Sequence, residues 1–197
     1  MSLAEEQELL RRIQADKKEF GTLFDEYYKP VFRYLFRRTG DYDLSKDMAA
    51  ETFLKAFLKI DSFVWRHISI SSWLYRIATN EANLYFRKKQ YQPVNLGSVI
   101  NDEKLRQADS EEERQALEEE MKQFVDFNLV RQKLALLPTH YQEVIALRYF
   151  ENKDNREIGL ILNKPEGTIK SLLSRGLEKL RTLAMPWRCN QIETFAL

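Results

Sequence analysis

The sequence predicts an all-α protein made of two small helical domains joined by a flexible linker. Apolar residues recur at three- and four-residue spacing, and the alternation typical of strands is hard to find. Five prolines and six glycines in 197 residues favour long helices over a turn-rich β fold. Residues 1–100 carry a net charge of +3, residues 101–122 of −5 and residues 128–184 of +4. Two mildly basic segments thus flank an acidic connecting segment. This charge distribution indicates two domains that could both bind the phosphates of a nucleic acid.

Composition excludes several classes of site. Cys189 is the only cysteine, so there is no internal disulfide and no cysteine-rich metal site. The two histidines, His67 and His140, are remote in sequence, and we predict neither a metal nor a cofactor. The N-terminus is acidic without the apolar core of a signal peptide, and no apolar run approaches membrane-spanning length. We therefore expect a soluble, cytoplasmic protein without direct membrane insertion.

Three helices are predicted before residue 61. The first covers 3–20 and is ended or bent at Phe20-Gly21. The second carries a dense apolar and aromatic stripe that predicts core packing, and Gly40-Asp41 breaks it. The third covers roughly 43–60. The inward-facing residues are predicted to be Phe24, Tyr27, Tyr28, Val31, Phe32, Leu35 and Phe36 in the second helix, and Met48, Phe53, Ala56, Phe57 and Ile60 in the third.

Residues 61–72 are predicted to form a loop in which aromatic, basic and hydroxyl side chains are interleaved. Such groups can stack on unpaired bases and bond to phosphates. Alternatively, Phe63 and Trp65 simply cover the core. A fourth helix starts near Ser71-Ser72, either of which can cap it. Two interior asparagines, Asn80 and Asn83, are mildly unfavourable in a helix, so this polar face is either a candidate for base readout or plain exposed surface.

The linker is predicted at 93–109, where periodicity is weak. Ser110 and Glu113 fit a capping box that opens a long acidic helix, which Pro138 ends. Thr139 can cap the helix that follows. The tail 185–197 receives no role.

Residues 157–175 predict helix, tight turn, helix. The turn falls at Asn163-Lys164, and Pro165 suits the first position of the second helix. That helix sets Ile169, Leu173, Leu177 and Leu180 in one stripe, and its other face carries Lys170, Ser171, Ser174 and Arg175. A polar, basic second helix can enter a DNA major groove. The pattern alone does not distinguish such a DNA reader from an ordinary helical hairpin.

Three motifs, in order, give the chain its resemblance to a known family. Residues 47–53 (DMAAETF) are similar to D-x-x-Q-E-T-F, and residues 72–80 (SWLYRIATN) are similar to S-W-L-Y-R-I-A-x-N. Leu137-Pro138, Glu157-Ile158 and residues 167–171 (GTIKS) are similar to L-P, E-I-A and G-T-V-K-S. The chain thus resembles a bacterial RNA polymerase sigma factor of the extracytoplasmic-function type, over residues 5–90 and 126–182.

The resemblance implies two domains and a function. Residues 1–92 would form the region 2 domain and residues 110–184 the region 4 domain, which contains the helix-turn-helix. The protein would bind core RNA polymerase and promoter DNA, and an anti-sigma factor can be a further partner. Promoter melting would need no catalytic group, because capture of unpaired non-template bases offsets stacking of about 1.4 kcal/mol per step.

The resemblance also implies three sets of site residues. Core polymerase would be bound by Asp47, Glu51, Thr52 and Lys55. The minus-ten element would be bound by Arg66, His67, Ser69, Ser71, Trp73, Arg76, Asn80, Asn83, Arg87 and Lys88. The minus-thirty-five element would be bound by Pro165, Glu166, Thr168, Lys170, Ser171, Ser174 and Arg175.

The sequence departs from the family pattern at four positions. Ala50 replaces glutamine, so polymerase affinity would lean more on Asp47, Glu51 and Lys55. Gly159 replaces alanine, and Leu172 stands where many relatives have arginine. Gly176 replaces alanine within the recognition helix, which costs roughly 1 kcal/mol unless close packing needs a glycine there.

Two other functions were weighed. A one-component regulator would use the helix-turn-helix as a dimer on palindromic sites, with the N-terminal half as a sensor, but that half shows no ligand-cavity signal. An all-helical enzyme would need a nucleophile–base pair, a metal cluster or a phosphate loop. The sequence shows none of these, so no enzymatic activity is predicted.

Overall fold

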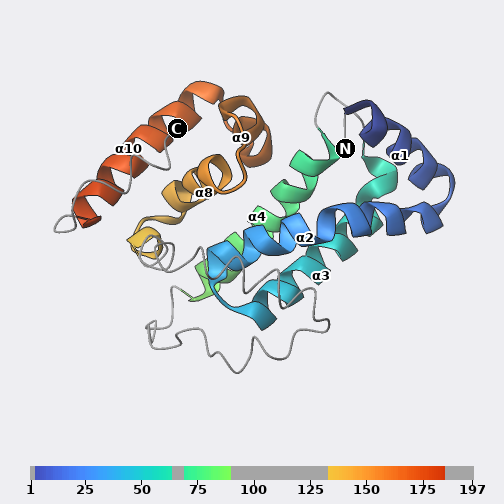
Figure 1. Cartoon of the computed structure of the whole chain (residues 1–197), viewed down its shortest axis with the longest axis horizontal. Coiled ribbons are helices and arrows are strands. Elements are labelled where there is room, and N and C mark those ends of the chain that lie inside the picture. The colour runs from blue at the N-terminus through green and yellow to red at the C-terminus, as the bar shows by residue number, and fades with distance from the viewer. Residues whose placement is uncertain (1–2, 64–68, 90–132, 185–197) are drawn as a thin grey trace. The chain divides into compact units, whose positions relative to one another are not determined.

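The computed structural model describes residues 3–63, 69–89 and 133–184, and every regular element in those ranges is a helix (Figure 1). The predicted all-α class is confirmed. Contacts divide the chain into two compact units, residues 1–94 with 156–165 and residues 95–155 with 166–197. The predicted linker, the C-terminal tail and most of the acidic helix lie outside the described residues. Of that helix, residues 133–135 are described as helical and a turn follows, so it ends before Pro138 as predicted. The predicted domain boundaries stay predictions.

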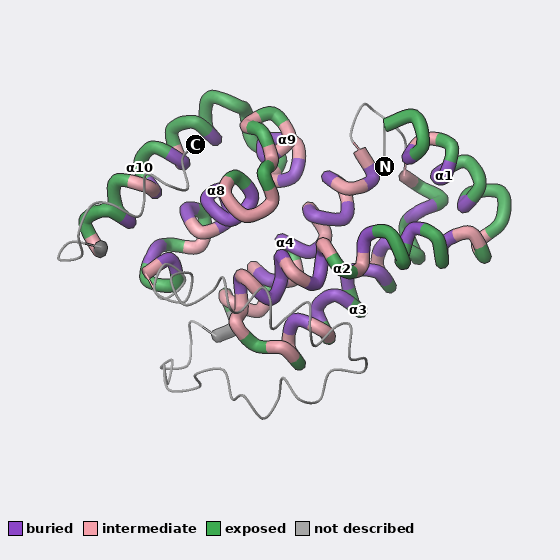
Figure 2. Tube along the Cα trace, viewed as in Figure 1, coloured by how far each residue is buried: buried purple, intermediate pink, exposed green. Residues whose placement is uncertain are grey.

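The first unit is built on three long helices, α2 (Phe20–Thr39), α3 (Tyr42–Lys59) and α4 (Ile70–Lys89). Each of the three packs against the other two. Their apolar faces supply a core of fully buried side chains, among them Leu23, Val31, Tyr34, Leu35, Ala49, Ala56, Ile70, Leu74, Ala78 and Ala82. This packing gives α4 one buried side and one side that faces away from the core (Figure 2).

The aromatic stripe of α2 packs largely as predicted. Tyr27, Phe32 and Phe36 are buried, and the Phe32 ring lies edge-on to Tyr42 with 5.3 Å between centroids. Phe24 is 38% exposed, although its ring contacts Phe53 at 5.0 Å. Phe57 was predicted to face inward, but it stays 37% exposed. Its ring instead contacts the edge of Phe20 and the ammonium group of Lys17.

The first helix ends earlier than predicted. Helix α1 covers Leu3–Ala15, and a 3-10 turn η1 (Lys17–Glu19) separates it from α2. Asp16 caps this turn, because its carboxylate accepts the Lys18 backbone N–H at 2.9 Å. Gly21 lies inside the first turn of α2, so the break comes from an Asp cap rather than from glycine.

The predicted break at Gly40-Asp41 is confirmed. Gly40 has φ of 69°, the left-handed conformation that glycine adopts at little cost, and its N–H bonds to the Phe36 carbonyl at 2.7 Å. Asp41 then caps α3 by accepting the Leu44 N–H at 3.1 Å. A 3-10 turn η2 (Ile60–Ser62) follows α3 directly.

The remaining described helices are α8 (Thr139–Tyr149), α9 (Asn155–Leu162) and α10 (Glu166–Ala184). The predicted cap at Thr139 is wrong, since Thr139 is already the first residue of α8 and Pro138 stands at the cap position without a side-chain bond. The predicted order of helix, turn and helix is confirmed along the chain. Asn163, in the turn, takes a left-handed φ of 54°, and α10 begins one residue after Pro165.

In the second unit α10 packs on α8, and Gly176 lies at their closest approach. A Cβ atom at position 176 would lie 3.1 Å from Cδ1 of Ile145 and 3.2 Å from Cδ1 of Tyr141. The glycine therefore lets two helix backbones approach where a branched side chain would not fit.

We predict that Gly176→Val destabilises the second unit by about 1–3 kcal/mol, because a Cβ atom and two methyl groups must enter this contact. Amide hydrogen exchange of α8 and α10 in the full chain measures the effect. Gly167→Ala is the matched control, since nothing lies within 4 Å of its added Cβ. Equal exchange rates for the wild type and Gly176→Val would show that the contact does not set the helix spacing.

Candidate nucleic-acid interface

One side of α4 carries five of the ten side chains predicted to contact minus-ten DNA. Trp73, Arg76, Asn80, Asn83 and Arg87 follow one another at intervals of three and four residues, so a helix aligns them in one stripe. Asn80 and Arg87 are exposed, and the other three are half-buried. The core packing of α4 thus leaves this stripe accessible.

The start of α4 differs from the prediction. Ser69 caps the helix, because its hydroxyl accepts the Ser72 N–H at 3.0 Å and donates to the Ser72 hydroxyl at 2.9 Å. Ser71 and Ser72 were the predicted caps. Ser72 is instead buried, and Ser71 lies within the first turn, on the side of the helix away from the Trp73 stripe. Ser71 is therefore not brought together with the other predicted minus-ten residues.

Two residues of this stripe, Trp73 and Arg76, already have contacts, and two other predicted minus-ten residues lie outside the described residues. The Trp73 ring packs on Phe63, with 4.7 Å between centroids. Within the first unit, Arg76 donates to the backbone carbonyls of Leu160 and Ile161, so it must be released before it can reach phosphate. Arg66 and His67 lie outside the described residues, and Lys88 lies in the last turn of α4.

A buried guanidinium lies beside Asn83. Arg38 is 9% exposed and donates to the Tyr34 hydroxyl at 3.1 Å and to Oδ1 of Asn83 at 3.2 Å. Its guanidinium also lies over the Phe86 ring. The Tyr34 hydroxyl in turn bonds to Thr79 at 2.8 Å. Because the Asn83 oxygen already accepts from Arg38, the amide N–H groups are the part of Asn83 free to meet a ligand.

Helix α3 presents the residues predicted to bind core polymerase. Asp47 and Glu51 are exposed on one side of the helix. Lys55 pairs with Glu51 at 3.0 Å and with Glu81 of α4 at 2.7 Å, and hydrogen bonds to these two carboxylates raise its pKa. Lys55 therefore ties α3 to α4 as well as bordering this side of α3.

Thr52 does not reach the surface. Its side chain is fully buried, and its hydroxyl donates to the Met48 carbonyl at 2.7 Å. We therefore leave it out of the candidate docking face.

Two leucines that were not predicted as site residues lie beside Asp47 and Glu51. Leu54 is 52% exposed and Leu58 is 69% exposed, and helical geometry places both on the same side as the two carboxylates. Their four-residue spacing was the available signal. An exposed apolar stripe flanked by acids is typical of a protein-binding surface.

The predicted minus-thirty-five residues are all exposed, on or just before the first half of α10. Lys170 pairs with Glu166 at 2.9 Å, one helical turn away, and the Ser171 hydroxyl donates to the Gly167 carbonyl at 3.0 Å. The buried residues Ile169, Leu173 and Leu180 occupy the other side, as predicted. Among the described residues, these polar contacts of Lys170 and Ser171 are thus local to α10, and this face is exposed.

Neither metal nor membrane sites are found within the described ranges. These residues hold no group of three or more His, Cys, Asp or Glu side chains placed to bind a metal ion. Their helices include none with the length and apolar character needed to cross a bilayer.

Two family models match the chain, and both describe regions of the same protein family. The family model of sigma-70 region 2 matches residues 23–91, and that of sigma-70 region 4 matches residues 127–180. The ECF RNA polymerase sigma factor SigW of Bacillus subtilis is 34% identical over 85% of this chain and 90% of its own length.

Two solved structures share the fold. CnrH, solved in complex with the cytosolic domain of CnrY, matches with a TM-score of 0.65 at 17% identity, over 90% of this chain and 96% of its own. RpoE of Bartonella quintana, solved with the anti-sigma factor NepR, matches with a TM-score of 0.58 at 20% identity, over 87% of this chain and 99% of its own.

We predict that Asn83→Asp raises the free energy of unfolding of the first unit by about 1 kcal/mol at pH 7, because a carboxylate pairs better than an amide with buried Arg38. Arg38 would depress the pKa of the new carboxyl. The gain is therefore present above its unfolded pKa of about 3.9 and is lost as the pH falls through the folded pKa.

Urea unfolding as a function of pH measures this gain. Asn80→Asp, an exposed position on the same helix, is the control and should change stability by less than about 0.5 kcal/mol. A stability at pH 7 equal to that of the wild type would show that Arg38 and Asn83 are not coupled.

Proposed function

Since the chain belongs to the extracytoplasmic-function RNA polymerase sigma factors of the sigma-70 family, we propose how its described residues divide the work of promoter recognition. As a sigma factor, the protein binds core RNA polymerase, directs it to promoters and initiates transcription. The alternative of a one-component regulator acting without polymerase is not supported, because both family models match sigma regions. We infer that the protein works in the cytoplasm, where bacterial polymerase transcribes, and that it supplies no catalytic group itself.

The exposed stripe of α4 carries the proposal for the minus-ten element. Exposed Asn80 and the N–H groups of Asn83 would donate to base edges, and exposed Arg87 would neutralise phosphate. Trp73, held against Phe63, presents an aromatic surface near the start of the helix, where an unpaired base can stack. The stripe would bind the non-template strand once it is unpaired, and this binding energy would favour melting.

The α3 face supports docking on polymerase. Asp47 and Glu51 would supply charge complementarity, and Leu54 and Leu58 would supply the apolar contact that excludes water. We also propose an anti-sigma factor as a partner that covers this surface. The support is that the structural neighbour RpoE was solved with an anti-sigma factor, and that two exposed leucines on one helix face favour a protein cover.

The exposed face of α10 supports reading of the minus-thirty-five element. Lys170 and Arg175 would bond to phosphate or guanine, and Ser171 and Ser174 to base edges or sugars. Thr168, next to the N-terminus of α10, would lie close to the phosphate backbone, where helix N–H groups favour an anion.

We predict that Lys170→Ala weakens holoenzyme binding to duplex promoter DNA and lowers the slope of log K against log salt by about one unit, because one phosphate contact is lost. Lys179→Ala is the control, because Lys179 lies on the opposite side of α10 with its ammonium near the Tyr141 ring. A salt slope unchanged by Lys170→Ala would remove Lys170 from phosphate binding.

We predict that Asn80→Ala slows open-complex formation on duplex promoters, while a pre-melted promoter bubble is still bound, with reduced affinity. Permanganate reactivity of unpaired thymines measures opening. The control is Thr22→Ala, an exposed polar-to-alanine change on α2. Opening at the wild-type rate in the Asn80→Ala holoenzyme would exclude Asn80 from the melting site.

A further inference from the structure

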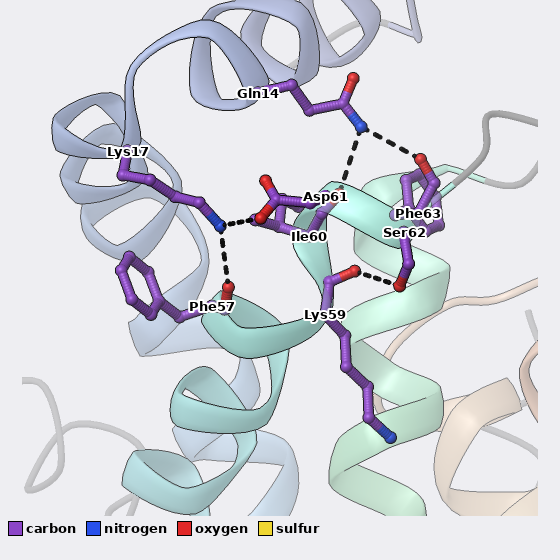
Figure 3. Close-up of polar contacts among 8 residues, drawn as sticks. All are labelled: Gln14, Lys17, Phe57, Lys59, Ile60, Asp61, Ser62 and Phe63. Atoms are coloured by element: carbon purple, nitrogen blue, oxygen red, sulfur yellow. Dashed lines mark hydrogen bonds and ion pairs between the residues drawn. The ribbon is translucent and has the colours of Figure 1, made fainter.

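Helix α1 reaches the segment that ends α3. The Gln14 side-chain amide donates to the carbonyls of Ile60 and Phe63, both at 3.2 Å (Figure 3). Just after α1, the Lys17 ammonium pairs with Asp61 at 2.6 Å and donates to the Phe57 carbonyl at 3.4 Å. Most of these contacts are to backbone carbonyls, so they fix the path of the chain through residues 57–63.

Helix α1 also reaches the start of α4. Glu6 is 3% exposed, and its Oε2 accepts the N–H of Ile70, the first residue of α4, at 2.8 Å. A carboxylate is favoured there, because the first N–H groups of a helix lack helical partners and carry partial positive charge. Its Oε1 accepts the Tyr27 hydroxyl at 2.6 Å. Burial and this bond to Glu6 raise the pKa of Tyr27, so the hydroxyl keeps its proton and remains a donor.

These polar contacts connect α1 to specific backbone atoms, which apolar packing does not do. Leu9, Leu10 and Ile13 are buried and supply the apolar packing of α1 within the first unit. Glu6 and Gln14 instead connect α1 to backbone atoms on the two sides of residues 64–68, which lie outside the described residues. The matched region 2 model begins at residue 23, so α1 precedes it.

We propose that Glu6 and Gln14 are positioning residues for promoter opening. Through them α1 sets the end of η2 and the start of α4 in the relative placement that binding of single-stranded minus-ten DNA requires. The inference rests on the proposed role of α4 in binding minus-ten DNA. Trp73 lies in the first turn of α4 and packs on Phe63, so a shift of this turn would also shift Trp73. Neither residue needs to touch DNA.

The test uses holoenzyme assembled from core polymerase and full-length variants. Glu6→Gln keeps the side-chain size but loses one acceptor, and Gln14→Met keeps the length but loses the donor. Two affinities are measured, one for core polymerase and one for a single-stranded non-template oligonucleotide that spans the minus-ten element. We expect each variant to weaken oligonucleotide binding by about tenfold and to change core affinity by less than about twofold.

Glu8→Ala is the control on the same helix, because exposed Glu8 pairs with exposed Arg11 of the same helix. It should leave both affinities unchanged. Gln14 is exposed, so Gln14→Met keeps the test decisive even if Glu6→Gln fails to fold.

Two results would overturn the inference. One is wild-type oligonucleotide affinity in Gln14→Met holoenzyme. The other is a parallel loss of both affinities, which a merely structural role predicts because both surfaces belong to the first unit. Failure of the wild-type holoenzyme to bind the oligonucleotide would instead contradict the proposed function itself, and the inference would fall with it.

Discussion

The burial of one side of α4 against α2 and α3 is the constraint on which the first unit depends. Small residues, Ala78 and Ala82, let α4 approach its neighbours, and the buried hydroxyls of Tyr34 and Thr79 bond to each other between α2 and α4. Once this side is fixed, helical periodicity alone decides which residues remain outside. The accessible stripe of α4 is thus a geometric consequence of its core packing.

The same packing ties the candidate site to the scaffold. Arg38 of α2 donates a hydrogen bond to Asn83, Lys55 of α3 forms an ion pair with Glu81 of α4, and Ser69 caps α4 at its start. A site built on a rigid helix and supported by neighbouring side chains needs little reorganisation when it binds a ligand. On α3, by contrast, Leu54 and Leu58 are exposed, as expected of a surface that a partner covers.

Local rules predicted much of this from sequence, because they act over a few residues. The end of α2 at Gly40 and the turn at Asn163 follow from the conformational preferences of glycine and asparagine. The two faces of α10 follow from helical periodicity. Contacts between distant segments were beyond such rules. A buried Glu6 reads as a solvated charge, Thr52 as a surface hydroxyl and Gly176 as a helix defect, until the structure places each against a partner. The roles of the site residues themselves came from the family resemblance and stay predictions.

The exposed face of α10 affects how the sequence of such a protein can evolve. Within the described part of the chain, the segment from Thr168 to Arg175 contributes Ile169 and Leu173 to the core, with Leu172 half-buried, and the polar side chains of Lys170 and Ser171 make contacts within the helix. Substituting them should leave folding nearly unaffected. The upstream DNA preference proposed for this face could therefore drift or be redesigned one residue at a time, whereas altering the α4 stripe disturbs groups that also hold the fold. The two halves of the molecule thus differ in evolvability.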